Sequence, residues 1–489
     1  METNTILAGQ EHGHHLDRGS QMLFQSPEFL FLFLPVVVLG IMFLQRRGDL
    51  LTKHFMLAAS WFFYAWWDWR CVFLFVPQML LNFHMGTWLR RHPTKRLLSA
   101  GIALNLGLIG YFKYTNFFLF SLASISGHDF APLDIVLPIG ISFYTFQQIE
   151  YLMDCYRQEI DTGRWIDHSL YISFFPHLVA GPIVYHRELV PQFRREQPFR
   201  CTLDNVFRGF CLFSVAMAKK CILADGMARI AEPVFRAAQN AEAITTFDAW
   251  TGMLAFAFQL YFDFSAYSDM AVALAVMFGI VLPINFSSPY TATNISEFWR
   301  RWHITLSRLM RDYLYLPLGG NRVGPLRQIF NLVLVMFIGG LWHGAAWTFV
   351  LWGVIHGLLL VVYHLWSKQH FLRLPKPAAW ALTFLAVCLS WVIFRADSME
   401  AAGRIYASLM NFGQGATTSV ATIIPQKVIK YLCYGFAVCL LLPRSQTWME
   451  SDRWWGWKPN LLWALACGVL FAASLLSLTR VNEFLYFQF

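Results

Sequence analysis

Two histidines between Asn294 and Gly357 have neighbours that suit a group-transfer reaction. His303 lies in the basic sequence SEFWRRWHITLSRLMRD, and His343 ends a long apolar run at LWHGAAWTF. An imidazole has an unperturbed pKa of about 6.5, so it can take up a proton near neutral pH. An ionisable group within an apolar run is costly and points to function. We therefore predict that the chemistry of this chain lies in residues 294–357.

The residues around His303 predict one amphipathic helix. Asn294 and Glu297 are spaced like a capping box, so the helix is expected to begin near Ile295. At about 100° per residue, four polar residues share one face of a continuous helix: Arg300, His303, Ser307 and Arg311. This face could lie at the membrane interface with its arginines on lipid phosphates. Alternatively, it could line a cytoplasmic funnel for an anionic donor.

His343 has an apolar, glycine-flanked setting. It follows Trp342 and precedes Trp347, and we expect both tryptophans at the substrate site together with Arg300, Ser307 and Arg311. Nearby glycines at 339, 340 and 344 would let a ligand approach the backbone closely. His356 lies about 220° around from His343 on a continuous helix, so we expect it to face elsewhere and to pack.

Other polar residues are weaker candidates. His177 lies in FFPHLVAGPI, a short segment with two prolines that suits a re-entrant or half-buried piece. It could line a pathway or simply pack. Asp263 and Asp269 do not share a helical face, which disfavours a paired-carboxylate site. His12, His14 and His15 could bind a metal, but a disordered tail explains them as well, and no metal site is predicted.

The composition predicts a polytopic membrane protein. Apolar residues make up 57% of the 489 residues and charged residues 14%, whereas soluble domains carry roughly 25% charged residues. Spans of about 20 residues leave room for on the order of ten helices. The net charge of +9 comes from basic loops typical of the positive-inside pattern, so nucleic acid is not an expected partner. Nine scattered cysteines without a C-x-x-C pair exclude a disulfide framework and a zinc ribbon.

The order of apolar and basic segments predicts the domain organisation. Residues 1–21 form a polar tail, expected to be disordered, and residues 22–489 form one membrane domain. Basic residues after the first span place that loop in the cytoplasm and the N-terminus outside. The first span is expected near 29–44, and the later spans near 54–89 (a hairpin), 97–122, 137–160, 206–224, 249–283, 328–340, 345–365, 378–394, 428–443 and 460–478. Polar residues of the span 137–160 are expected to bridge helices.

Several segments together resemble one family. SEFWRRWHITLSRLMRDYLYLPLGGNR, LWHGAAWTF, QLYFDFSAYSDMA, FFPHLVAGPI and the ending EFLYFQF are similar to the membrane-bound O-acyltransferases. The similarity is to the bacterial branch that contains the alginate O-acetyltransferase membrane subunit and the D-alanyl transfer protein of teichoic acids. His343 matches the histidine of the family's WHG motif, and His303 matches the RWH motif. Ala266 stands where glycine is usual, and Thr305 where serine is common.

The resemblance implies an all-α membrane fold, with ten or more transmembrane helices in a ring around a thin centre. It also implies acetyl transfer from a cytoplasmic thioester, acetyl-CoA, to an extracellular or periplasmic polysaccharide such as alginate or cellulose, with no bound cofactor. A periplasmic partner of the SGNH hydrolase type would share the work at a bacterial inner membrane. His343 would act as general base, a covalent acyl-histidine being the variant mechanism, and His303 would position the donor or stabilise the oxyanion.

Other functions stay open from the residues alone. Peptidoglycan or teichoic acid could be the acceptor. The chain could also be a carrier or transport subunit, or a scaffold of a polysaccharide export complex. The arginines at 300 and 311 could attract coenzyme A phosphates, although the positive-inside pattern accounts for them equally well.

Overall fold

The structure is a computed structural model that describes residues 22–128, 130–369, 374–411, 425–450, 458, 460–478 and 485. These residues divide into two compact units, which are described separately. The first lies within Met1–Val179 and Tyr185–Pro198, and the second within Ala180–Val184 and Phe199–Phe489. The tail at 1–21 lies outside the described residues, and the single membrane domain of 22–489 stays a prediction.

The first unit contains the helices α1 to α9 and two π-helical turns. Their bounds are η2 Phe29–Phe33, α1 Leu34–Leu44, α2 Asp49–Trp67, α3 Trp69–Arg91, α4 Lys95–Ile109, η3 Gly110–Tyr114, α5 Thr115–Ser126, α6 Ile141–Tyr156, α7 Trp165–Ser173, α8 Phe175–Leu178 and α9 His186–Phe193.

Polar side chains of α6 join the helices of this unit. The carboxylate of Glu150 accepts a 2.6 Å hydrogen bond from the hydroxyl of Tyr171 in α7 and a 3.1 Å bond from the backbone N–H of His186 in α9. Burying Glu150 is tolerable because both of its carboxylate oxygens find partners. Glu150 therefore bridges α6 to α7 and α9.

The second unit contains the remaining helices. Their bounds are α10 Leu203–Ala218, η4 Lys219–Ala224, α11 Asp225–Gln239, α12 Thr246–Met277, η5 Pro289–Thr291, α13 Ile295–Arg301, α14 Ile304–Met310, η6 Arg311–Tyr315, α15 Pro325–His343, α16 Trp347–Gln369, α17 Lys376–Arg395, α18 Met399–Met410, α19 Pro425–Leu441, α20 Ser445–Glu450 and α21 Leu461–Ser477.

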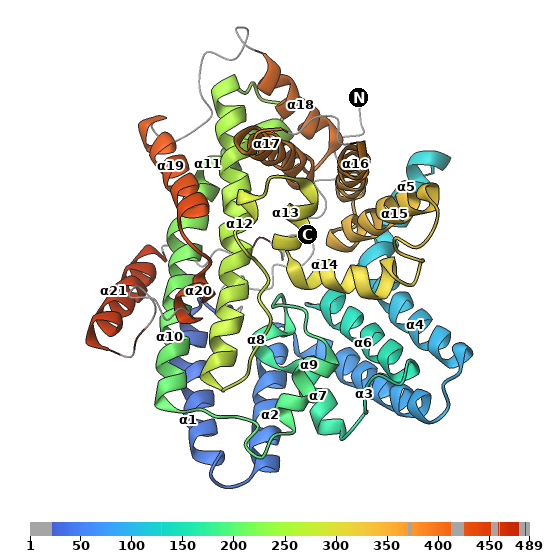
Figure 1. Ribbon diagram of the computed structural model, residues 1–489, viewed down its shortest axis with the longest axis vertical. Coiled ribbons are helices and arrows are strands. Elements are labelled where there is room, and N and C mark those ends of the chain that lie inside the picture. The colour runs from blue at the N-terminus through green and yellow to red at the C-terminus, as the bar shows by residue number, and fades with distance from the viewer. Residues whose placement is uncertain are drawn as a thin grey trace. The chain divides into compact units, whose positions relative to one another are not determined.

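The long helix α12 forms the core of the second unit. It is apolar and buried on nearly all sides, as expected for a helix enclosed by others. The helices α10, α11 and α18 pack along it (Figure 1). Two of its buried carboxylates are neutralised separately, because Asp263 lies 2.6 Å from the ammonium group of Lys220 and Asp269 lies 2.7 Å from that of Lys219.

The described residues include five helical segments long and apolar enough to cross a membrane. They are Trp69–Arg91, Lys95–Ser126, Pro325–His343, Trp347–Lys368 and Lys376–Arg395. All regular elements among the described residues are helices, so the all-α membrane class is confirmed. The ring of ten or more spans and the orientation of the N-terminus stay predictions.

The helices α15 and α16 pack closely through glycines. A Cβ atom at Gly353 would collide with the backbone carbonyl oxygen of Met336, and a Cβ atom at Gly340 would meet Gly353. Small residues at such crossings let apolar helices approach closely. This close packing sets His343, the last residue of α15, beside the first turns of α16. Gly339, in contrast, has open space around the position of a Cβ atom.

Candidate functional site

The helix predicted around His303 is broken at that residue. The structure has two short helices, α13 and α14, and His303 between them has a left-handed backbone with φ of 42° and ψ of 53°. This conformation is uncommon for a residue with a side chain and marks sites held by their surroundings. The prediction of one continuous amphipathic helix was therefore wrong, and His303 does not share a face with the arginines.

Asn285 is the residue that breaks the helix. In a continuous helix the N–H of Ile304 would bond to the carbonyl of Arg300. Instead it donates to the Asn285 carbonyl at 2.9 Å, and the N–H of Thr305 donates to Asn285 Oδ1 at 3.3 Å. The carbonyl of Arg301 accepts from the N–H of Ser287 at 2.9 Å. A distant loop thus satisfies the backbone groups that helix continuation would otherwise use.

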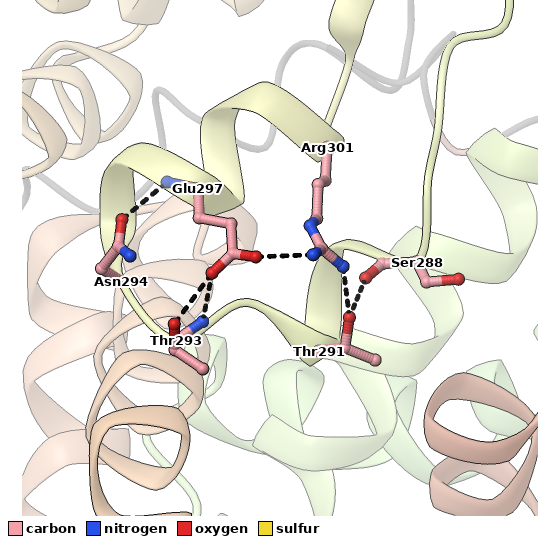
Figure 2. A network of polar contacts seen from close by, with 6 residues as sticks. All are labelled: Ser288, Thr291, Thr293, Asn294, Glu297 and Arg301. Atoms are coloured by element: carbon pink, nitrogen blue, oxygen red, sulfur yellow. Dashed lines mark hydrogen bonds and ion pairs between the residues drawn. The ribbon is translucent and has the colours of Figure 1, made fainter. Parts of the chain in front are cut away.

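The start of α13 agrees with the sequence. The helix begins at Ile295, and Asn294 Oδ1 accepts from the N–H of Glu297 at 2.8 Å. The carboxylate of Glu297 accepts hydrogen bonds from the N–H and the hydroxyl of Thr293, both at 2.9 Å, and from the guanidinium group of Arg301 at 2.5 Å (Figure 2). This network occupies Arg301 with structural contacts, so it fixes the first helix of the site rather than a ligand.

A cavity of about 180 Å³ lies beside His343. It is a partly open cavity lined by α13, α14, η6, α15 and α16, and two further predicted residues, Ser307 and Arg311, also line it. Most of its other lining side chains are leucine, methionine and valine. An engineered apolar cavity of about 150 Å³ binds benzene. The cavity beside His343 is therefore large enough for a short acyl group and the start of its thioester arm.

His303 lies behind this cavity rather than in its lining. Its side chain is fully buried, and its ring centroid is 6.4 Å from that of His343 and 4.7 Å from that of Phe264. Burial lowers the pKa of His303 below the usual range for histidine, because the charged ring would lose its hydration. The ring is therefore neutral at neutral pH.

The partners of His303 fix which ring nitrogen carries the proton. Asn285 Oδ1 accepts from the N–H of Thr305, so the atom facing His303 is an oxygen, and the 3.1 Å contact requires a proton on His303 Nδ1. The other nitrogen, Nε2, is buried without a hydrogen-bond partner among the described residues. The neutral ring thus presents an acceptor at Nε2, not a donor.

The remaining predicted residues have unequal positions. Arg311 is exposed at the cavity and donates to Asp312 at 2.7 Å. Arg300 and Trp347 are exposed and do not line the cavity, and Trp342 is buried with its ring centroid 5.1 Å from that of His343. The structure therefore brings His343, Ser307 and Arg311 together at one cavity and leaves Arg300 and Trp347 outside it.

His356 has a complete set of partners. The indole N–H of Trp299 donates to His356 Nδ1 at 3.2 Å, and His356 Nε2 lies 2.9 Å from the hydroxyl of Ser390. That hydroxyl donates to the carbonyl of Val387 at 2.7 Å, so it accepts the proton of Nε2. His356 is fully buried and does not line the cavity. The expectation that it packs is confirmed.

Two tryptophans of the site were missed by the sequence reasoning. Trp299 and Trp352 both line the cavity, and the ring centroid of Trp352 lies 5.2 Å from that of His343 at an interplanar angle of 89°. Their signal was weak, because the chain has 20 tryptophans and most lie in apolar segments. The spacing of Trp299 before the RWH sequence and of Trp352 after the WHG sequence was the only available cue.

The other candidates from the sequence do not join this site. His177 is buried in the first unit against the ring of Phe174, with centroids 5.9 Å apart, which agrees with packing. Asp263 and Asp269 pair with different lysines, as their spacing suggested. Among the described residues, no cluster of histidine, cysteine and carboxylate side chains could hold a metal ion. The histidines at 12, 14 and 15 lie outside the described residues.

Comparisons with known proteins agree with the geometry. The sequence pattern of the membrane-bound O-acyltransferase family matches residues 157–399, which include both histidines and the cavity. A peptidoglycan O-acetyltransferase of Helicobacter pylori is 37% identical, and the match covers 96% of this chain and 98% of that protein. A probable alginate O-acetylase of Pseudomonas putida is 40% identical over 96% of this chain and 100% of its own. A teichoic acid D-alanyltransferase of Bacillus subtilis is 27% identical over 54% of this chain and 70% of its own.

Proposed function

The chain belongs to the membrane-bound O-acyltransferase family, and from this premise we propose that it is an O-acetyltransferase of cell-envelope polysaccharides. The donor is acetyl-CoA on the cytoplasmic side, and the acceptor is a hydroxyl group delivered from the other side of the membrane. The observation that carries this proposal is the cavity beside His343, whose size suits a short acyl group.

In this proposal His343 is the general base. The acceptor oxygen attacks the carbonyl carbon of the thioester while its proton moves to the His343 imidazole, and the carbonyl electron pair moves onto oxygen. When the carbonyl re-forms, the C–S bond breaks and the thiolate takes the proton from His343. A buried imidazole at a cavity lined by apolar side chains suits this role, because it holds one proton between the two steps. A covalent acyl-histidine is the alternative that transfer kinetics can separate.

We assign His303 a positioning role. Its Nδ1 proton is held by Asn285, and its left-handed backbone joins α13 to α14, both of which contribute to the cavity wall. Arg311 is exposed at the cavity, where it can attract the phosphates of coenzyme A. Its ion pair with Asp312 partly cancels its positive charge at this place. Ser307 lines the same cavity as His343 and Arg311.

The acceptor is proposed from the relatives and has two candidates. The name of one relative gives peptidoglycan and that of the other gives alginate, at similar identities of 37% and 40%. Both are polysaccharides outside the cytoplasmic membrane, which fits a multi-pass chain of a bacterial inner membrane. We further propose a periplasmic acyltransferase partner of the SGNH type and a ring of ten or more spans around the site.

The test of the proposed function is turnover of labelled acetyl-CoA by the purified full-length chain. Alginate oligosaccharides and peptidoglycan fragments serve as acceptors in separate reactions, with and without the proposed partner. Release of coenzyme A thiol with acetyl ester on one acceptor supports the enzyme and identifies the polymer. Binding of acetyl-CoA without turnover under all these conditions would instead support a carrier or scaffold and contradict the proposal.

A further inference from the structure

The wall of the cavity contains one buried donor that no other residue uses. Trp352 is fully buried, yet its indole N–H has no hydrogen-bond partner among the described residues. A buried tryptophan N–H normally finds an acceptor. Leaving such a donor unsatisfied costs roughly 1–3 kcal/mol. Exceptions of this kind in native structures call for an explanation, and functional groups are one of them.

The other donors of the lining are already engaged. The N–H of Trp299 donates to His356 at 3.2 Å, and the hydroxyl of Tyr315 donates to Asn321 at 2.6 Å. Arg311 donates to Asp312 at 2.7 Å. The hydroxyl of Ser307 donates to a backbone carbonyl at 3.4 Å. Arg311 is exposed and keeps further N–H groups, whereas among the buried side-chain donors that line the cavity with His343, the indole N–H of Trp352 is the one without an acceptor among the described residues.

The rings around Trp352 leave the cavity as the place for an acceptor. Trp391 stacks on it with centroids 5.5 Å apart and an interplanar angle of 18°, and Phe394 stands edge-on at 5.1 Å. Neither ring offers an acceptor atom. His356 lies 4.8 Å away, but its Nδ1 already accepts from Trp299. The described residues supply no acceptor for this N–H, and a ligand in the cavity that Trp352 lines can supply one.

Neutral His303 cannot donate a hydrogen bond to a ligand oxygen, because its unpartnered nitrogen, Nε2, is an acceptor. We propose that the indole N–H of Trp352 donates a hydrogen bond to the carbonyl oxygen of the acyl thioester and stabilises the oxyanion that forms there. The inference rests on the proposed function and adds a catalytic residue to it. As His343 takes the acceptor's proton, the carbonyl electron pair moves onto the oxygen bound by Trp352, and it returns when the C–S bond breaks.

The test removes the N–H while keeping the ring. In the full-length chain, Trp352 is replaced by 3-benzothienylalanine, in which sulfur stands where the indole has N–H. The matched control is the same replacement at Trp391, which stacks on Trp352 but does not line the cavity. Thiol release from acetyl-CoA is measured with the acceptor that the wild-type chain uses. Thermal unfolding in detergent checks that both variants fold.

We expect kcat to fall by roughly 10²-fold at Trp352 with KM for acetyl-CoA changed little, because the bond strengthens in the transition state. The Trp391 variant should keep kcat within about twofold of the wild-type value, since it retains the donor that matters. A wild-type kcat in the Trp352 variant would overturn the inference while leaving the proposed function intact. A wild-type chain that turns over no acetyl-CoA would overturn the proposed function, and this inference with it.

An independent readout uses a ketone analogue of acetyl-CoA with a ¹³C-labelled carbonyl. A hydrogen bond from Trp352 lowers the carbonyl stretching frequency of the bound analogue, and the Trp352 replacement should return it toward the value in an apolar solvent. An equal frequency in the wild-type and Trp352-replaced chains would contradict the contact even if kcat differed.

Discussion

His343 and His356 differ in how completely their surroundings use them. Both are buried, and both ring centroids lie close to that of Trp352, at 5.2 Å and 4.8 Å. His356 has a partner at each nitrogen and no contact with the cavity, whereas His343 lines the cavity beside an unused indole donor. Burial therefore does not distinguish the proposed general base from the packed histidine, whereas access to the cavity does.

The contrast also separates two kinds of mutation effect. Loss of His356 should lower stability, because it leaves the half-buried Trp299 with an unpaired indole N–H. Loss of His343 should lower the rate, because its role arises only with substrates bound. The following variants test this division, beginning with the largest expected effect.

Separating α15 from α16 should affect both histidines. Gly353→Val places side-chain atoms against the backbone of Met336, so we expect loss of several kcal/mol of stability and little folded protein. The measurement is the monodisperse yield in detergent with the melting temperature. The matched control is Gly339→Ala, for which the structure has open space and which should keep the fold. A normal melting temperature for Gly353→Val would contradict the close packing of these helices.

Replacing His356, which has a hydrogen-bond partner at each ring nitrogen, should mainly change stability. His356→Ala leaves the indole N–H of Trp299 and one contact of Ser390 unpaired, at a cost of about 1–3 kcal/mol. The melting temperature should fall, while the rate per folded molecule should fall far less than in His343→Ala. If His356→Ala kept its melting temperature but lost all transfer, His356 would be a catalytic residue and the comparison would fail.

Acid should weaken the fold through buried histidines that do not line the cavity. Burial lowers the pKa values of His303 and His186, so the unfolded chain binds the additional protons. The contribution of these uncharged rings to the free energy of unfolding is fully present above pH 6.5, roughly the histidine pKa in the unfolded chain, and is lost as the pH falls below this value. Melting temperatures between pH 7.5 and 5 at constant ionic strength measure this loss. His186→Gln should reduce the slope, whereas the same change at the exposed His128 should not.

Replacing Arg311 or Arg300 should have the smallest effects on acetyl transfer. Arg311→Gln removes a charge at the cavity, and we expect KM for acetyl-CoA to rise a few-fold, by less at high salt. Arg300→Gln is the control, because Arg300 is exposed and outside the cavity lining, and its KM should stay within about twofold. Equal increases in both variants would indicate a general surface potential instead of a site at Arg311.

Local patterns in the sequence predicted much of the fold. Apolar runs located α15, α16 and α17 to within a few residues, and the spacing of Asn294 and Glu297 gave the start of α13. These features depend on residues within a few positions of one another. The break at His303 could not be predicted in this way, because Asn285, far along the chain, takes the backbone N–H groups that a helix would use.

The site was predicted in the same partial way. The sequence singled out His343 and assigned His356 to packing. The assignment of His356 agrees with the structure, but the continuous helix from which it was argued is broken between α15 and α16. It could not show that Trp299 is held by His356 or that Trp352 lacks an acceptor, because both depend on packing between α13, α16 and α17. It also placed Arg300 and Trp347 with the substrate, whereas the structure leaves them outside the cavity lining.

The most direct test of the central claim compares the wild-type chain with His343→Ala and His343→Gln in acetyl transfer. All three should bind acetyl-CoA and melt at similar temperatures, and both variants should lose at least about 10²-fold in kcat, the lower range for a positioned base. Acetyl ester formed at the wild-type rate by either variant would show that His343 is not the general base.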